Sequence, residues 1–98
     1  MPLSFEEEAR KKLERYISAT ERVFKTMDVS LPEDPSLRRL AEENVRLSKI
    51  YFEDSKYYFG KQDYITALVC IAYCEGIIDA CRNMGWLRYE WTFGTSPG

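Results

Sequence analysis

Two acidic side chains, Glu75 and Asp79, interrupt an otherwise apolar stretch of this chain and are its best candidates for chemistry. At about 100° per residue they lie one turn apart on one flank of a helix. Two carboxylates at this spacing repel one another if both ionise away from water, so either donors surround them or one keeps its proton. The pair could fix packing, receive a ligand or a partner's basic group, or act as a general acid and base. We expect no catalysis, because the sequence offers neither a nucleophile nor a metal to work with them.

Three cysteines, Cys70, Cys74 and Cys81, occupy a neighbouring face of the same helix. Cys70 and Cys74 are one turn apart and cannot bridge readily within a regular helix, which indicates a reducing compartment. The spacings do not match the usual zinc pairs, and the chain has no histidine. We interpret all three as small buried apolar residues, and we expect no metal or other cofactor.

The helix that carries these groups should span residues 63–84. Asp63 is suited to cap its start, Gly85 stands where a left-handed C-terminal residue belongs, and Arg82 lies in the last turn. Apolar residues go almost all the way round this helix, so more than one side must be covered. A neighbour, a partner subunit or the C-terminal tail should cover the remaining side, where small residues permit a close approach. That side consists of Ile65, Val69, Tyr73, Gly76 and Ala80.

Two further amphipathic helices are predicted at residues 4–27 and 35–59. A capping box begins at Ser4, and Pro35 follows a capping Asp34 at the start of the second helix. The second helix should point one stripe of side chains inward. That stripe consists of Leu37, Leu40, Asn44, Leu47, Tyr51, Ser55 and Tyr58.

The second and third helices should form an antiparallel hairpin, because the link between them is too short for any other arrangement. In such a hairpin the numbers of facing residues sum to roughly 123. Asn44 should then lie near Asp79, and Ser48 or Tyr51 near Glu75. These five residues form the predicted polar seam or ligand site, in which the second helix supplies the donors that buried carboxylates require.

Within the C-terminal tail, residues 85–98, the run from Trp86 to Phe93 alternates its side chains with the period of a β-strand. A lone strand has no sheet to join in this chain. The tail therefore either lies across the bundle over the remaining side of the third helix, which we favour, or pairs with a partner or a second copy. Its large aromatic side chains also make it the candidate interface. The interface residues are Trp86, Leu87, Tyr89, Trp91 and Phe93.

These elements predict an all-α fold, an antiparallel three-helix bundle with an extended aromatic C-terminal tail. Its length of 98 residues fits a single domain, residues 1–98. Three helices are too few to cover so apolar a third helix, so we expect the chain to self-associate.

The net charge and the hydropathy of the chain limit the partners and the compartment that we expect. The net charge of −2 lacks the basic excess of a general nucleic-acid binder, so we expect no nucleic acid as partner. The N-terminus has no apolar signal segment, and the longest near-apolar run, Ile65 to Cys74, is about half the roughly 20 residues that cross a bilayer. We therefore expect a cytoplasmic protein that does not bind membranes.

The segment from Tyr57 to Gly85, YYFGKQDYITALVCIAYCEGIIDACRNMG, resembles the C-terminal signature of an archaeal family, Domain of Unknown Function 357. The likeness covers most of the chain, from an N-terminal helix to a tryptophan-bearing tail. The matching positions are Asp63-Tyr64, Ala67-Leu68, Ala72-Tyr73, Glu75-Gly76 and Asp79-Ala80. The resemblance implies a small helical bundle and no assigned reaction. Some relatives carry such a segment beside a cytidylyltransferase-like domain, which implies an accessory role near nucleotidyl transfer.

Two weaker likenesses concern the same segment. The run YYFGKQDYITAL is similar to the turn of a tetratricopeptide hairpin, but no second repeat follows it. The pattern of turn, tyrosine, alanine and glutamate is similar to HEPN-type helical domains. Their ribonucleases use an arginine and histidine motif, which a chain without histidine cannot provide.

The sequence therefore favours a non-catalytic interaction or scaffolding module that recognises a protein partner or itself through the tail and the two acids. The alternative is a small-molecule or nucleotide-binding accessory domain to a nucleotidyltransferase-type enzyme.

Overall fold

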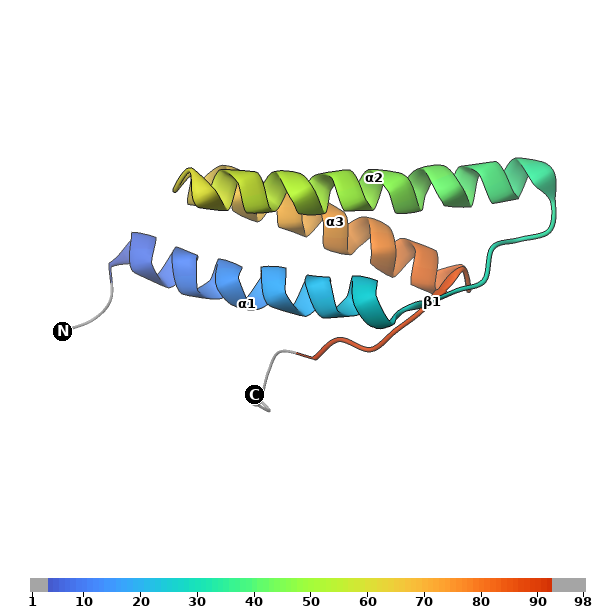
Figure 1. Cartoon of the computed structure of the whole chain (residues 1–98), viewed down its shortest axis with the longest axis horizontal. Coiled ribbons are helices and arrows are strands. Elements are labelled where there is room, and N and C mark those ends of the chain that lie inside the picture. Colours follow the sequence, from blue (N-terminus) through green and yellow to red (C-terminus); the bar gives the residue numbers. More distant parts are fainter. Residues whose placement is uncertain (1–3, 93–98) are drawn as a thin grey trace.

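The computed structural model describes residues 4–92, which form three helices and one short pair of strands. Helix α1 spans Phe5–Thr26, α2 spans Pro35–Gly60 and α3 spans Tyr64–Asn83. Each helix runs antiparallel to the next one along the chain, and α3 lies behind the other two in Figure 1. The prediction of an all-α three-helix bundle is confirmed, and each helix end lies within one residue of the predicted position.

Capping side chains and one glycine set the ends of the helices. Ser4, Asp34 and Asp63 each accept a hydrogen bond from a backbone N–H of the following first turn, at 3.0 or 3.1 Å. Gly85 follows α3 with a φ of 81°, in the left-handed region that a residue without Cβ adopts at little cost. The local signals in the sequence are therefore the ones that the fold uses.

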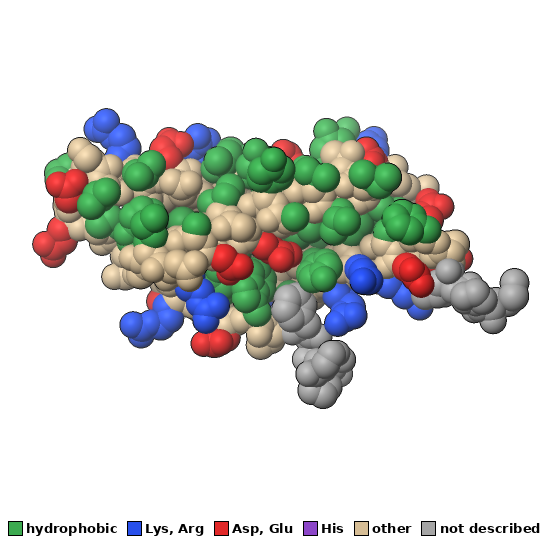
Figure 2. All heavy atoms as spheres, turned by 180° about the vertical axis from the view of Figure 1, so that it is seen from behind, with side chains coloured by type: hydrophobic (Ala, Val, Ile, Leu, Met, Phe, Trp, Pro, Cys, Tyr) green, Lys and Arg blue, Asp and Glu red, His purple; other side chains and the backbone are tan. Residues whose placement is uncertain are grey.

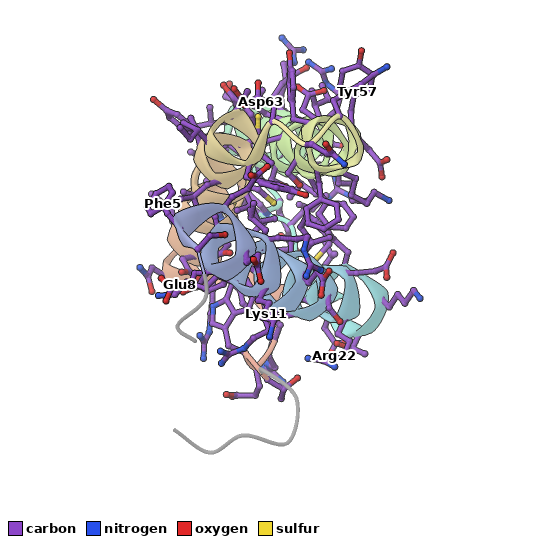
Figure 3. All side chains as sticks on the ribbon, turned by 90° about the vertical axis from the view of Figure 1, so that its left-hand side faces the viewer. Phe5, Glu8, Lys11, Arg22, Tyr57 and Asp63 are labelled. Atoms are coloured by element: carbon purple, nitrogen blue, oxygen red, sulfur yellow. The ribbon has the colours of Figure 1, made fainter. Side chains whose placement is uncertain are left out.

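The core lies where α1 and α2 meet one side of α3. Toward the hairpin, Leu13 of α1 and Phe52 of α2 belong to one buried cluster with Ile71 of α3. Toward the other end, Val23 of α1 and Ile78 of α3 belong to a second cluster, which includes part of the tail. Figure 3, which looks along the bundle, shows α1 on one side of the α2–α3 pair. In the described part of the chain, α1 therefore covers only that side of the pair.

A pair of two-residue strands joins the tail to the end of α1. Strand β1, Asp28–Val29, pairs antiparallel with strand β2, Leu87–Arg88. The Ser30 N–H extends the pairing by donating to the carbonyl oxygen of Trp86 at 2.8 Å. The expectation that the tail strand has no partner within the chain is thus wrong, because the link between α1 and α2 supplies one.

In residues 85–92, the described part of the tail, no residue covers the remaining side of α3, contrary to the arrangement that the sequence favoured. Because β1 follows α1 directly, pairing with it draws the tail along α1 and the nearby flank of α3 (Figure 1). On the other side of α3, Ile65 is 70% exposed and Tyr73 is 58% exposed. Seen from behind in Figure 2, hydrophobic side chains spread along much of the length of the molecule.

By length and composition alone, α3 is the one helix among residues 4–92 that could cross a membrane. An 18-residue window of it has a mean hydropathy of 1.6, and 33% of that window is buried in the bundle. The apolar run from Ile65 to Cys74 led to the opposite expectation, because it stops at Glu75 and omits the apolar residues beyond. The core helix of a soluble protein passes the same test, so the finding describes the composition of α3 and no more.

Candidate functional site

Asp79 is the acid that the tail contacts directly. Its Oδ1 accepts a hydrogen bond from the Tyr89 hydroxyl at 2.5 Å and another from Trp91 Nε1 at 2.9 Å. The two aromatic rings meet edge to face, with centroids 5.4 Å apart. Burial, and then the hydrogen bond to Asp79, raise the pKa of Tyr89 well above its usual value, so the hydroxyl stays a donor. Asp79 thus has the donors that the sequence required, but the tail supplies them.

Two arginines hold the tail on either side of this contact. Arg22 of α1 donates to the carbonyl oxygen of Thr92 at 2.6 Å. Arg82 of α3 lies over the Tyr89 ring, 5.1 Å from its centroid, and forms an ion pair with Glu90 at 3.8 Å. Because the ion pair is exposed, it contributes little, and the buried contacts around Asp79 carry most of the attachment.

The predicted interface residues of the tail are used within the chain. Leu87 is 3% exposed and Tyr89 is 5% exposed, while Trp86 and Trp91 are half-buried against the second core cluster. The interface assignment is wrong for Leu87 and Tyr89, because their surface is already buried by α1 and α3. Phe93, the last predicted interface residue, lies outside the described residues.

Glu75 lies one turn before Asp79 and is half-buried. Burial, and then the neighbouring charge of Asp79, raise the pKa of Glu75 from 4.5 to about 7. Near neutral pH the Glu75 carboxyl therefore exchanges between its neutral and charged forms. This agrees with one of the two alternatives that the spacing of the acids left open, in which one of them keeps its proton.

The α2 side chains expected to serve the acids form their contacts elsewhere. Asn44 Nδ2 donates to the carbonyl oxygen of Leu40 at 2.8 Å, and Ser48 Oγ donates to that of Val45 at 2.6 Å, both within α2. Tyr51 stacks on Tyr73 of α3, with ring centroids 5.3 Å apart. The prediction that α2 supplies the donors is therefore wrong. The hairpin rule gives the level of a residue along α3 but not its direction around the helix, and Asp79 points to the tail.

The three cysteines are free and buried. Burial raises the pKa of all three thiols, and that of Cys74 to about 12. A thiol of such high pKa is protonated at neutral pH and is a poor nucleophile or metal ligand. Among the residues that the structure describes, no group of three or more His, Cys, Asp or Glu side chains could hold a metal ion.

Exposed apolar residues of the described chain gather on the outer face of α3. We give this name to the side of α3 that α1 and the tail leave uncovered. Its members are Ile65, Leu68, Val69, Ala72, Tyr73, Gly76 and Ala80. Along the α2 side of this face runs a groove of about 520 Å³, and Asn44 of α2 and Ile77 line its edge. The lining of the groove contains no charged residue, and Asp79 borders the face on the side where the tail contacts it.

The outer face continues past both of its edges. A second hollow, of about 280 Å³, shares Ile65 and Leu68 with it and extends to Phe5 of α1, which is 78% exposed. Figure 3 shows Phe5 at the rim of the bundle. On α2, Leu40 and Leu47 flank Asn44 on the same stripe and are exposed. The sequence had placed these two leucines inside, because periodicity defines a stripe without telling whether another helix covers it.

Comparisons with known proteins identify a family and a solved structure of similar fold. A family model described as "Protein of unknown function (DUF357)" matches residues 15–87. The crystal structure of a protein from Archaeoglobus fulgidus, assigned to the same family, is similar with a TM-score of 0.71 and 22% sequence identity. The similarity covers 89% of this chain and 100% of that one. No curated protein matches the chain.

Proposed function

Because this chain belongs to the DUF357 family, whose description gives no function, we propose that it is a non-catalytic module that binds protein through the outer face of α3. This proposal moves the interface from the tail, where the sequence placed it, to the opposite side of the same helix. The tail and Asp79 then have a structural role, which is to hold α3 against α1.

The exposure of the outer face is the observation that carries the proposal. Ile65, Val69 and Tyr73 are 70%, 50% and 58% exposed, and each lies next to a further apolar residue of the face. Scattered apolar residues are normal on a protein surface, but a continuous apolar patch along a helix marks a binding surface. Covering it removes apolar area from water, which is the main driving force of protein association.

The shape of the face suits a helix. The groove lined by Val69, Ala72 and Gly76 follows the axis of α3, and Tyr73, whose ring stacks on Tyr51, forms part of its wall. An amphipathic helix laid into such a groove places its apolar residues at three- and four-residue spacing along it. Backbones approach closely where one helix carries alanine and glycine, so the contact can be well packed.

The candidate chemical groups support a binding role over catalysis. The thiols are buried, and Asp79 is occupied by the tail. The alternative of nucleotide binding has less support, because Glu75 and Asp79 would repel phosphate groups. An α3 groove without charge also offers no electrostatic recognition of a nucleotide.

Cysteine labelling in living cells tests the proposal without knowledge of the partner. We expect Val69→Cys to react slowly with a membrane-permeant maleimide, because a bound protein covers it. Ser18→Cys, at an exposed position of α1, is the matched control and should react quickly. The native thiols are buried, so the unsubstituted chain gives the background. Equal reaction rates at the two positions would refute a covered outer face.

A further inference from the structure

We propose that the protein bound at the outer face is a second copy of this chain, whose α3 packs antiparallel on α3 about a two-fold axis between Ala72 and Tyr73. This inference rests on the proposed function and identifies its partner. The argument uses the pattern of side-chain size on the face, the presence of a glycine at its centre and the apolar area that it exposes.

The outer face contains two parallel rows that differ in size. Ile65, Val69 and Tyr73 form a row of large side chains, each four residues from the next. A second row of small residues has the same spacing and consists of Ala72, Gly76 and Ala80. Rows of this kind are the ridges and grooves through which helices pack. One face of one helix thus carries both halves of a packing surface.

An antiparallel two-fold pair about this axis brings residues of the two copies to the same level along the helices when their numbers have the same sum. Ile65 then faces the partner's Ala80, and Val69 faces the partner's Gly76. Tyr73 and the partner's Ala72 come to the same level at the axis, because all three pairs have the same sum of residue numbers, and the two Tyr73 side chains lie on the same side of the pair. A two-fold interface requires such self-complementarity, in which residue i meets j and j meets i. The same register also sets Leu68 beside the partner's Ile77 at the edge.

Gly76 gives independent support, because the fold of a single chain does not need it. A Cβ added to Gly76 would meet no atom within 4 Å, and the residue lies inside α3 with helical backbone. Glycine in a helix interior is less favourable than alanine. A close approach by something outside the chain accounts for a glycine here, and in the proposed pair it faces the partner's Val69 near the centre of the contact.

The exposed area matches what a stable dimer requires. Six large apolar side chains on or beside the face are between 38% and 70% exposed: Leu40, Leu47, Ile65, Leu68, Val69 and Tyr73. Half-exposed side chains of this size leave roughly 600 Å² open, before the small residues and Phe5 are added, against about 800 Å² per partner in a standard interface. A lipid surface or another protein would also cover apolar area, but neither explains why a two-fold rotation brings Val69 of each copy opposite Gly76 of the other.

Mass in solution tests the inference with the intact chain. Sedimentation equilibrium should give twice the 11.5 kDa of one chain at high concentration and the single mass on dilution. Gly76→Gln should weaken the dimer at least tenfold while helix content stays the same, because the new side chain meets open space in one chain and Val69 in the pair. Ser18→Gln, exposed on α1, is the control and should leave the dimer intact. A monomer at all concentrations, or a dimer that Gly76→Gln leaves unchanged, overturns the inference.

Disulfide trapping tests the register. In the double variant Val69→Cys, Gly76→Cys, two intermolecular disulfides should form, because each new thiol faces the other one across the axis. Within one chain the two positions are roughly 10 Å apart along the helix, too far to bridge. The control pair Val69→Cys, Ala80→Cys has the wrong register and should remain mostly reduced. Equal trapping of the two pairs overturns the antiparallel arrangement.

The outcomes separate this inference from the function on which it rests. A monomer whose position 69 is nevertheless protected in cells overturns the second copy as partner and leaves the proposed function standing. A monomer that floats with phosphatidylcholine vesicles, and loses this property in Val69→Glu, overturns both in favour of a lipid surface. A monomer with position 69 freely labelled in cells also overturns both.

Discussion

The two sides of α3 differ in what the chain itself provides for them. On the flank near α1, Asp79 receives two hydrogen bonds from the tail, and Leu87 and Tyr89 are buried beside it. On the outer face, large apolar residues such as Ile65 remain exposed. Asp79 is thus paired within its own chain, and the apolar side is left open by the described residues. This contrast assigns the polar flank to folding and leaves the apolar face for the association that we propose.

Removing an aromatic ring from each side should give the largest difference. Tyr89→Ala should lower the free energy of unfolding by about 3–4 kcal/mol, because it leaves a cavity and removes a donor to Asp79. Tyr73→Ala should cost less than about 1 kcal/mol in the dilute monomer, where it loses only its stacking on Tyr51. Urea unfolding at low protein concentration measures both. Equal losses would contradict the division of α3 into a folding flank and an associating face.

Removing the carboxylate of Asp79 should have the next largest effect. Asp79→Ala leaves the Tyr89 hydroxyl and Trp91 Nε1 without their acceptor, at a cost of about 2 kcal/mol. Glu90→Ala removes only an exposed ion pair with Arg82 and should cost less than about 0.5 kcal/mol. Tryptophan fluorescence during denaturation reports both changes, because Trp91 lies at the site. A neutral Asp79→Ala would mean that the tail is held by apolar packing alone.

The titration of Glu75 should make stability fall as pH rises. Its pKa is about 7 in the folded chain and 4.5 as the reference, so the folded state binds more protons between these values. Stability is therefore highest below about pH 4.5 with respect to this group and declines through pH 7. Because Glu75 is only half-buried, solvent screening reduces the effect to about 1 kcal/mol.

Substitution of Glu75 by its amide isolates this effect. Glu75→Gln should match the parent chain at pH 4.5 and exceed its stability at pH 8, where the parent carries a poorly solvated charge. Thermal unfolding across this pH range measures the difference between the two proteins. A difference that stays constant with pH would exclude Glu75 as the titrating group.

The smallest predicted effect is at Gly76. Gly76→Ala should stabilise the dilute monomer by up to about 1 kcal/mol, because the new methyl group meets open space and alanine favours the helix. At concentrations where the chain associates, the gain should shrink, since the methyl group meets the partner's Val69. Urea midpoints at low and high concentration give the comparison. A gain independent of concentration would remove Gly76 from the interface.

Local signals in the sequence predicted the helices well because they act within a few residues. Ser4, Asp34 and Asp63 cap the helices as expected, and Gly85 takes its left-handed conformation. The β1 strand gave no such signal, since two residues, Asp28–Val29, are too few for a periodic pattern. Without β1, the sequence could not place the tail on the correct side of α3.

The candidate site depends on how the helices are rotated, which periodicity does not determine. Glu75 and Asp79 were correctly singled out as one acidic pair, but α2 was given as the source of their donors when Tyr89 and Trp91 of the tail supply those of Asp79. Leu40 was placed inside, yet it borders the outer face. The apolar residues that encircle α3 did predict that apolar side chains lie on more than one of its sides. The position of the open side around α3 can be determined only when the positions of α1 and the tail are known.

Solvent access at Val69 as a function of concentration tests most directly whether the outer face of α3 is a binding surface for a second copy. With the purified Val69→Cys chain, the maleimide reaction should be slow at high concentration and should rise on dilution to the rate of Ser18→Cys. Both rates should follow the mass from sedimentation. A Val69→Cys rate that is fast and the same at every concentration would contradict the account.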